Sequence, residues 1–182
     1  MKILASIIYK IYGWKIVGEK PKVKKAVIVS APHTSNWDFF WGELAFLKIG
    51  LKASILMKKE FFFFPLGLIL KAFNVIPVDR GNKKSGIVEQ MVDAFNSRDE
   101  MYLCITPEGS RKKRKKWKKG FLIIALKANV PIYLGGLDYK KKYCNVGPIY
   151  YPTGDVDKDM KFIMNHYKNA NAKYPENFST GD

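Results

Sequence analysis

The sequence predicts an α/β fold, a single-domain sandwich with a largely parallel central sheet flanked by helices. Apolar, strand-like runs alternate along the chain with stretches of helical length, and this alternation is typical of such a sandwich. The chain has 182 residues, of which 47% are hydrophobic, enough for the core of one domain of ordinary size. We find no linker and no internal repeat that would divide it further.

The first five elements after the N-terminus are predicted from apolar runs and from the residues that end them. They are a strand (25–30), a helix (36–50), a strand (52–58), a helical segment around Pro65 (60–73) and a strand (74–79). The run KAVIVS at 25–30 is uninterrupted, as in a strand buried on both faces. Gly50 is a natural helix stop, and Pro77 favours an edge or irregular position for the strand that contains it.

The second half of the chain repeats the alternation. The expected elements are an amphipathic helix (85–99), a strand (101–107), a helix (119–130), a strand (131–139), a hairpin-like segment (142–152) and a final helix (155–172). Ser85 is a possible cap for the first of these helices. Polar clusters follow the strands at 25–30, 74–79 and 101–107, so in a parallel sheet they would meet at one edge.

The N-terminal residues 1–20 are predicted to form an amphipathic helix ahead of a domain over 21–182. Apolar residues recur there at helical spacing, beside lysines: Ile3, Ile7, Ile8, Ile11 and Trp14. Such a helix either associates with an anionic membrane or packs on the domain, and the pattern leaves both readings open. The apolar run is short and lacks a cleavage site, which disfavours a signal peptide, and no stretch reaches the ~18 residues of a membrane span.

The charge of the chain indicates a polyanionic partner. There are 32 Lys and Arg against 16 Asp and Glu, a net charge of +16. Nucleic acid, an anionic membrane surface and an acidic protein all fit this excess. Cys104 and Cys144 are far apart and lack metal-ligand spacing, which favours a reduced, cytosolic chain and predicts no metal site.

His33 and Asp38 raise a choice between a helix cap and a catalytic pair. On a continuous helix, side chains five residues apart point about 140° away from each other. They can meet if His33 lies in the strand-to-helix turn and Asp38 in the first helical turn, and Pro32 favours that turn. Ser35 with Asp38 resembles a capping box, so Asp38 has a structural reading. In the functional reading Asp38 orients His33, which acts as a general base on a hydroxyl.

A second constellation follows the strand at 101–107. Residues 111–119 contain eight Lys or Arg in nine positions, interrupted by Trp117. Ahead of them the stretch PEGSR provides a glycine turn, a hydroxyl donor and a guanidinium fork suited to phosphate, at Gly109, Ser110 and Arg111. Glu108 is expected to stay ionised in this basic setting and to hold Arg80 or an acceptor hydroxyl. Arg80 itself stands before a glycine turn in VDRGN.

Together these clusters resemble the lysophospholipid/glycerolipid acyltransferase family, of the 1-acylglycerol-3-phosphate acyltransferase type. Four blocks follow the order of that family over roughly residues 26–135. Residues 32–38 correspond to the N-H-x-S-x-x-D block of the family, and residues 74–80 correspond loosely to its G-x-x-F-I-D/R-R block. Residues 106–112 correspond to the F-P-E-G-T-R-S block, and residues 130–132 to the V-P-I block. The second block has Asn74 where glycine is usual, and the last lacks its following proline. These two departures leave the identity of the acceptor open.

The resemblance implies acyl transfer from acyl-CoA or acyl carrier protein to a hydroxyl of a lyso-lipid, as in phospholipid biosynthesis, without an acyl-enzyme and without a metal or cofactor. His33 would be the general base and Asp38 its orienting partner. The acceptor head group would be held by Arg80, Glu108, Gly109, Ser110 and Arg111. The protein would be peripheral, on the cytoplasmic side of an anionic cell membrane, in an oligomeric state that remains open.

Two alternatives remain at this point. One is acylation of a lyso-aminolipid that carries no phosphate. The other is a basic nucleic-acid-binding module without catalysis, which is disfavoured because only Trp117 interrupts the basic run and no recognised binding signature is present.

Overall fold

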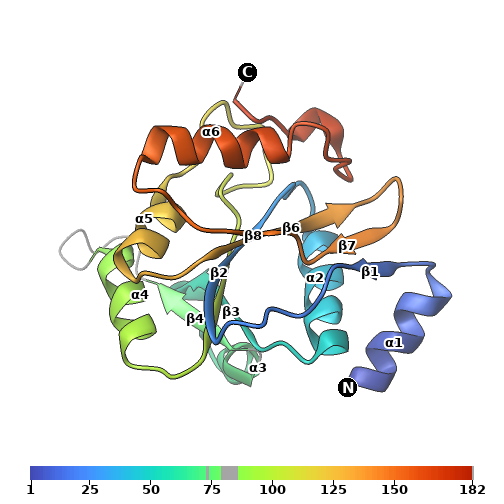
Figure 1. Cartoon of the computed structure of the whole chain (residues 1–182). Coiled ribbons are helices and arrows are strands. Elements are labelled where there is room, and N and C mark those ends of the chain that lie inside the picture. The colour runs from blue at the N-terminus through green and yellow to red at the C-terminus, as the bar shows by residue number, and fades with distance from the viewer. Residues whose placement is uncertain (73, 79–85, 182) are drawn as a thin grey trace.

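The computed structural model describes residues 1–72, 74–78 and 86–181 (Figure 1). Within them the chain folds around an 8-stranded sheet of order β1-β7-β6-β2-β5-β3-β4, with β8 paired to β6. The strands are β1 (Lys15–Val17), β2 (Lys25–Ser30), β3 (Ala53–Lys58), β4 (Val75–Val78), β5 (Met101–Ile105), β6 (Ile132–Asp138), β7 (Tyr143–Asn145) and β8 (Ile149–Tyr150).

The centre of the sheet is parallel, which confirms the predicted architecture. Strands β6, β2, β5, β3 and β4 run in one direction, with Val27 of β2 opposite Leu103 of β5 and Ile132 of β6. Strands β7 and β8 both run antiparallel to β6. The carboxyl ends of β2, β5 and β6 therefore meet at one edge, as expected for an open α/β sheet.

Helices cover both faces of the sheet. They are α1 (Lys2–Ile11), α2 (Asn36–Ile49), α3 (Leu66–Ala72), α4 (Ile87–Asn96), α5 (Gly120–Lys127) and α6 (Val156–His166), with 3-10 turns η1 (Lys59–Phe61) and η2 (Pro175–Asn177). On β2, Val27 and Val29 pack in the core cluster to which α4, α5 and α6 contribute, whereas Ile28 points to the other face, with Phe46 of α2. This alternation explains why the strand is apolar without interruption.

The N-terminal segment differs from the helix expected over 1–20. Helix α1 ends at Ile11, and Lys15–Val17 form strand β1, which pairs with β7. Gly13 adopts a left-handed conformation with a φ of 72°, and the following Trp14 is buried. A three-residue strand is set by its distant partner rather than by local periodicity, so the sequence pattern missed it.

Three other boundaries also differ. The segment 60–73 is helical only from Leu66, after Pro65, and the last helix ends at His166 rather than at 172. The segment 142–152 is not a hairpin of its own, because β7 and β8 each pair with β6. Helix α4 has Gly86 at its N-cap, and Ser85 lies outside the described residues. The prediction from Pro77 is confirmed, since β4 forms an edge of the sheet.

Gly136 allows β6 to pack closely against the turn that follows β2. A Cβ atom at this position would collide with the carbonyl oxygen of Ala31, which follows β2. The absence of a side chain therefore lets β6 lie directly against the turn that carries His33. In the described part of the chain, no helix is long and apolar enough to cross a bilayer.

Candidate active site

The turn between β2 and α2 places His33 and Asp38 side by side. Ser35 is the N-cap of α2 in an extended conformation, and its side chain with Asp38 forms a capping box. Nδ1 of His33 lies 3.2 Å from Oδ2 of Asp38. The same oxygen accepts hydrogen bonds from the backbone N–H groups of Thr34 at 2.7 Å and Ser35 at 2.8 Å. The capping and pairing functions of Asp38 thus coexist in one geometry.

Asp38 is held as a carboxylate. Its burial opposes ionisation, but hydrogen bonds from His33, from the hydroxyl of Tyr139 and from the backbone of Ser35 and Thr34 outweigh that effect and lower its pKa. With Nδ1 engaged by Asp38, Nε2 of His33 is the nitrogen left for proton transfer. The side chain of His33 is 21% exposed, so the imidazole is partly open to solvent.

Glu108 is buried next to the backbone of His33, and this burial disfavours the ionised form that the sequence suggested. Its Oε1 accepts a hydrogen bond of 2.7 Å from the backbone N–H of His33, and the residue is only 3% exposed. Burial, together with the negative charge of Asp38, raises the pKa of Glu108 to about 8, although the hydrogen bond from His33 works in the opposite direction. The carboxyl therefore supports the backbone of His33, and Arg80, its expected partner, lies outside the described residues.

The remaining predicted residues form the turn after β5. Gly109 has a φ of 66°, and the methylene groups of Lys118 lie against it. The hydroxyl of Ser110 donates to the carbonyl oxygen of Lys112 at 3.1 Å and accepts from Nε of Arg114 at 3.2 Å. Arg111 is exposed, so its guanidinium is available to an anion. Because β5 adjoins β2, this turn lies on one side of His33.

Trp117 anchors the basic run 111–119 to the core. Its ring is buried, contacts Tyr167 and Phe178, and its Nε1 donates to the carbonyl oxygen of Ser179 at 2.8 Å. A buried indole cannot stack on nucleic acid bases, so the one aromatic side chain in the basic run gives no support to the nucleic-acid alternative.

Two parts of the site were not predicted from the sequence. The hydroxyl of Tyr139, directly after β6, donates to Oδ1 of Asp38 at 2.7 Å. The backbone N–H of Tyr174, near the C-terminus, donates to Oγ1 of Thr34 at 3.2 Å. Tyr139 is the last residue of the fifth predicted strand, 131–139, and this place at the end of a strand was the one available signal. Nothing in the local pattern pointed to Tyr174.

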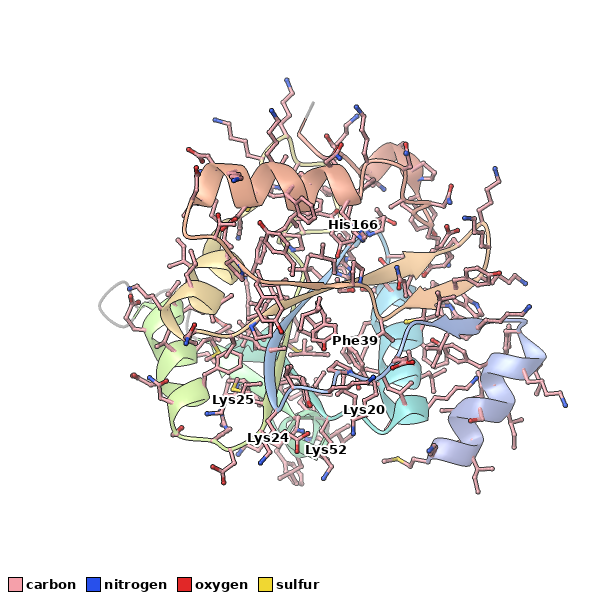
Figure 2. The ribbon with its side chains drawn as sticks, viewed as in Figure 1. Lys20, Lys24, Lys25, Phe39, Lys52 and His166 are labelled. Atoms are coloured by element: carbon pink, nitrogen blue, oxygen red, sulfur yellow. The ribbon has the colours of Figure 1, made fainter. Side chains whose placement is uncertain are left out.

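Other polar features lie apart from this site. An open hollow of about 570 Å³ includes Lys20, Lys52 and Arg98 in its lining and lies where β3, β4 and β5 begin, at the edge of the sheet opposite His33. Figure 2 labels Lys20 and Lys52, which line this hollow, in the lower part of the view, with Lys24 nearby. His166, also labelled in Figure 2, ends α6 and packs edge-on against Tyr167, which agrees with a structural or surface role.

The fold and the site define an α/β enzyme with a histidine–aspartate pair at the carboxyl edge of a parallel sheet. A family model described as Acyltransferase matches residues 14–133. The chain belongs to this acyltransferase family, and it is an enzyme that transfers acyl groups.

The crystal structure of the 1-acyl-sn-glycerophosphate (LPA) acyltransferase PlsC from Thermotoga maritima has the same fold. Its TM-score with this chain is 0.61 at 16% sequence identity, and the match covers 94% of this chain and 80% of that one. No curated protein sequence matches the chain.

Proposed function

We propose that this enzyme transfers a fatty acyl chain from a thioester to a hydroxyl of a lyso-lipid such as 1-acylglycerol 3-phosphate. The observation that carries the proposal is the 3.2 Å contact between Nδ1 of His33 and Oδ2 of Asp38, at the carboxyl edge of the sheet. The family and the fold of PlsC support the same class of reaction. The donor is acyl-CoA or acyl carrier protein, used as a co-substrate, and the reaction needs no cofactor.

In the proposed mechanism His33 acts directly on the acceptor. Its Nε2 takes the proton of the acceptor hydroxyl while that oxygen attacks the carbonyl carbon of the thioester. The tetrahedral intermediate collapses with cleavage of the C–S bond, and the leaving thiolate takes the proton from the imidazolium. Asp38 fixes the tautomer of His33 and stabilises the imidazolium between these two steps. No acyl group is attached to the protein.

The turn after β5 is the proposed site for the acceptor head group. Arg111 is exposed there and has the bidentate geometry that suits a phosphate, and Arg80 is proposed to assist it. Gly109 and Ser110 shape the turn. Glu108 enters the proposal as a positioning residue, because its hydrogen bond goes to the backbone of His33.

Helix α1 supports a peripheral position on an anionic membrane. Ala5 and Tyr9 pack against the domain, and the hydroxyl of Tyr9 donates to the carbonyl oxygen of Trp41 at 2.8 Å. The opposite side of the helix is exposed and apolar, with Ile3, Leu4, Ile7 and Ile11. We propose that residues 1–20 associate with the membrane, with α1 packed on the domain by one face and its other face in the lipid, on the cytoplasmic side.

Other exposed apolar side chains flank the catalytic edge. They lie in the first turn of α2 and in the segment that follows β3, and comprise Trp37, Phe39, Phe40, Phe61, Phe63 and Phe64. The start of α2 and the end of β3 lie at the same edge of the sheet as His33. This placement supports a site that faces the leaflet from which a lyso-lipid would come.

The test is a lipid product assay with a histidine control. The purified protein is incubated with mixed lyso-lipids, including 1-acylglycerol 3-phosphate and a lyso-aminolipid, and with either acyl-CoA or acyl carrier protein, and mass spectrometry identifies the product. His33→Ala should lower the rate by about 10²–10⁴-fold, as expected for loss of a general base. His166→Ala is the matched control and should retain activity. Acyl transfer that survives in His33→Ala would contradict the proposed mechanism. A product formed only from the lyso-aminolipid would contradict the proposal that the acceptor carries a phosphate.

A further inference from the structure

The segment that follows α6 returns to the catalytic turn and brings a lysine with it. The N–H of Tyr139 donates to the carbonyl oxygen of Asn171 at 2.9 Å, and the N–H of Tyr174 donates to Oγ1 of Thr34 at 3.2 Å. Lys173 lies between these two attachments. The segment is outside the matched residues 14–133, so the family model does not point to it.

The ammonium of Lys173 is framed by three aromatic rings that belong to the site. Its Nζ lies 5.0 Å from the ring centroid of Trp37, 5.7 Å from that of Tyr174 and 5.9 Å from that of Tyr139. Each ring is tied to the catalytic turn. Trp37 is in the first turn of α2, Tyr139 binds Asp38, and Tyr174 is held by Thr34. The rings restrict where the ammonium can lie, but they carry no negative charge that would form an ion pair with it.

The acidic groups of the site are engaged by donors other than Lys173. The two oxygens of Asp38 are occupied by four donors, from His33, Thr34, Ser35 and Tyr139. Glu108 is buried and bound to the backbone of His33. In the part of the chain that the structure describes, Lys173 forms no ion pair with a carboxylate.

Lys173 and Arg111 belong to segments that are attached to, or follow, the two strands on either side of β2. Strand β2 lies between β5 and β6 in the sheet. The chain runs from β5 to Arg111, and from β6 to Tyr139, whose backbone binds the segment that carries Lys173. His33 follows β2, the strand between these two. A phosphate carries up to two negative charges, so two cations on either side of the base suit such a group better than one.

We propose that Lys173 binds the anionic head group of the acceptor, on the side of His33 opposite Arg111, and so favours phosphate-bearing acceptors over neutral ones. This proposal rests on the proposed function. Lys173 is a specificity-determining residue in it and takes no part in proton transfer.

The experiment compares two acceptors that differ only in the phosphate, 1-acylglycerol 3-phosphate and 1-acylglycerol. Lys173→Met keeps an apolar stem over the rings but removes the charge, and Lys173→Arg restores it. For Lys173→Met, KM for the phosphate-bearing acceptor should rise about tenfold with little change in kcat, and kinetics with the neutral acceptor should stay as they were. Lys173→Arg should recover most of the affinity. Lys168→Met, which removes an exposed charge after α6, is the matched control and should leave the kinetics with both acceptors unchanged.

The outcomes separate specificity from a structural role. The proposal is wrong if Lys173→Met lowers the rate of acylation equally for both acceptors. It is also wrong if the variant has an unchanged thermal midpoint and unchanged kinetics with both acceptors. The former result would mean that the ammonium merely fastens the C-terminal segment to the rings. If the unaltered enzyme acylates neither acceptor but acylates a different substrate class, the proposed function fails as well as this inference.

Discussion

The hydroxyl of Tyr139 donates a 2.7 Å hydrogen bond to Oδ1 of Asp38 across 101 residues of sequence. The other carboxylate oxygen of Asp38 is 3.2 Å from Nδ1 of His33. Tyr139 thus binds the carboxylate oxygen that does not contact the imidazole, and the orientation of Asp38 toward His33 depends on where β6 ends.

Tyr139→Phe should lower kcat about tenfold while leaving KM nearly unchanged. The substitution keeps the ring and removes one donor to a charged acceptor, and such a hydrogen bond contributes about 1.5–3 kcal/mol. Steady-state kinetics with each variant checks this prediction. Tyr151→Phe, at an exposed tyrosine, is the matched control and should behave like the unaltered enzyme. An unchanged kcat in Tyr139→Phe would show that Asp38 is oriented without this bond.

Glu108→Gln should be well tolerated near pH 7, whereas Glu108→Ala should not. Burial raises the pKa of this carboxyl to about 8, so at neutral pH it is mostly uncharged and an amide of the same shape still accepts the hydrogen bond from His33. Alanine leaves that N–H without its acceptor, which costs about 1–3 kcal/mol of folding free energy. Thermal unfolding and activity of the two variants test the difference. An equal loss of stability and activity in Glu108→Gln and Glu108→Ala would mean that the enzyme needs the negative charge of Glu108.

The pH dependence of stability should also differ between Glu108→Gln and the unaltered protein. An ordinary glutamate in the unfolded chain loses its proton near 4.5, but Glu108 in the folded protein keeps it to about 8. Between these values the folded state binds more protons, so the contribution of Glu108 is present at low pH and is lost as pH rises toward 8.

Denaturant unfolding between pH 5 and 8 measures this slope. The free energy of unfolding should fall less steeply with pH in Glu108→Gln. Glu43, whose pKa burial raises to about 7, contributes a slope of the same sign in both proteins. An identical pH profile in the two proteins would contradict the assigned protonation of Glu108.

Trp117→Ala should destabilise the protein by about 3–5 kcal/mol, as expected for loss of a buried aromatic side chain. The change removes contacts with Tyr167 and Phe178 and the hydrogen bond to Ser179. Chemical denaturation measures the loss, and Lys116→Met, next to it in the basic run, should have little effect. A stable Trp117→Ala protein with impaired binding to polyanions would instead indicate that the indole acts at the surface.

Ile7→Glu should weaken binding to anionic vesicles with little effect on folding. Ile7 is exposed on α1, so a carboxylate there adds like charge and removes apolar area at the membrane interface. Sedimentation with vesicles rich in anionic lipid measures the bound fraction. Phe162→Glu makes a similar change on the exposed side of α6 and should leave binding intact. Equal loss in both variants would mean that binding follows net charge alone.

Several elements could be predicted because their signals are local. The apolar run at 25–30 indicated a strand buried in the sheet, and Pro77 indicated an edge strand. Both predictions are confirmed. Strand β1 could not be predicted, because its three residues are organised by pairing with Tyr143–Asn145. The short segments around β6 were misassigned for the same reason.

The sequence by itself determined the class of fold, the family resemblance and the closeness of His33 and Asp38. That contact depends on a turn and a cap within six residues, where chain connectivity leaves few alternatives. Only the tertiary structure decided what surrounds the pair. Glu108 reaches His33 across 75 residues, and Tyr174 reaches Thr34 across 140. Such contacts depend on strand order and on the path of the chain after α6, which no local pattern of residues encodes.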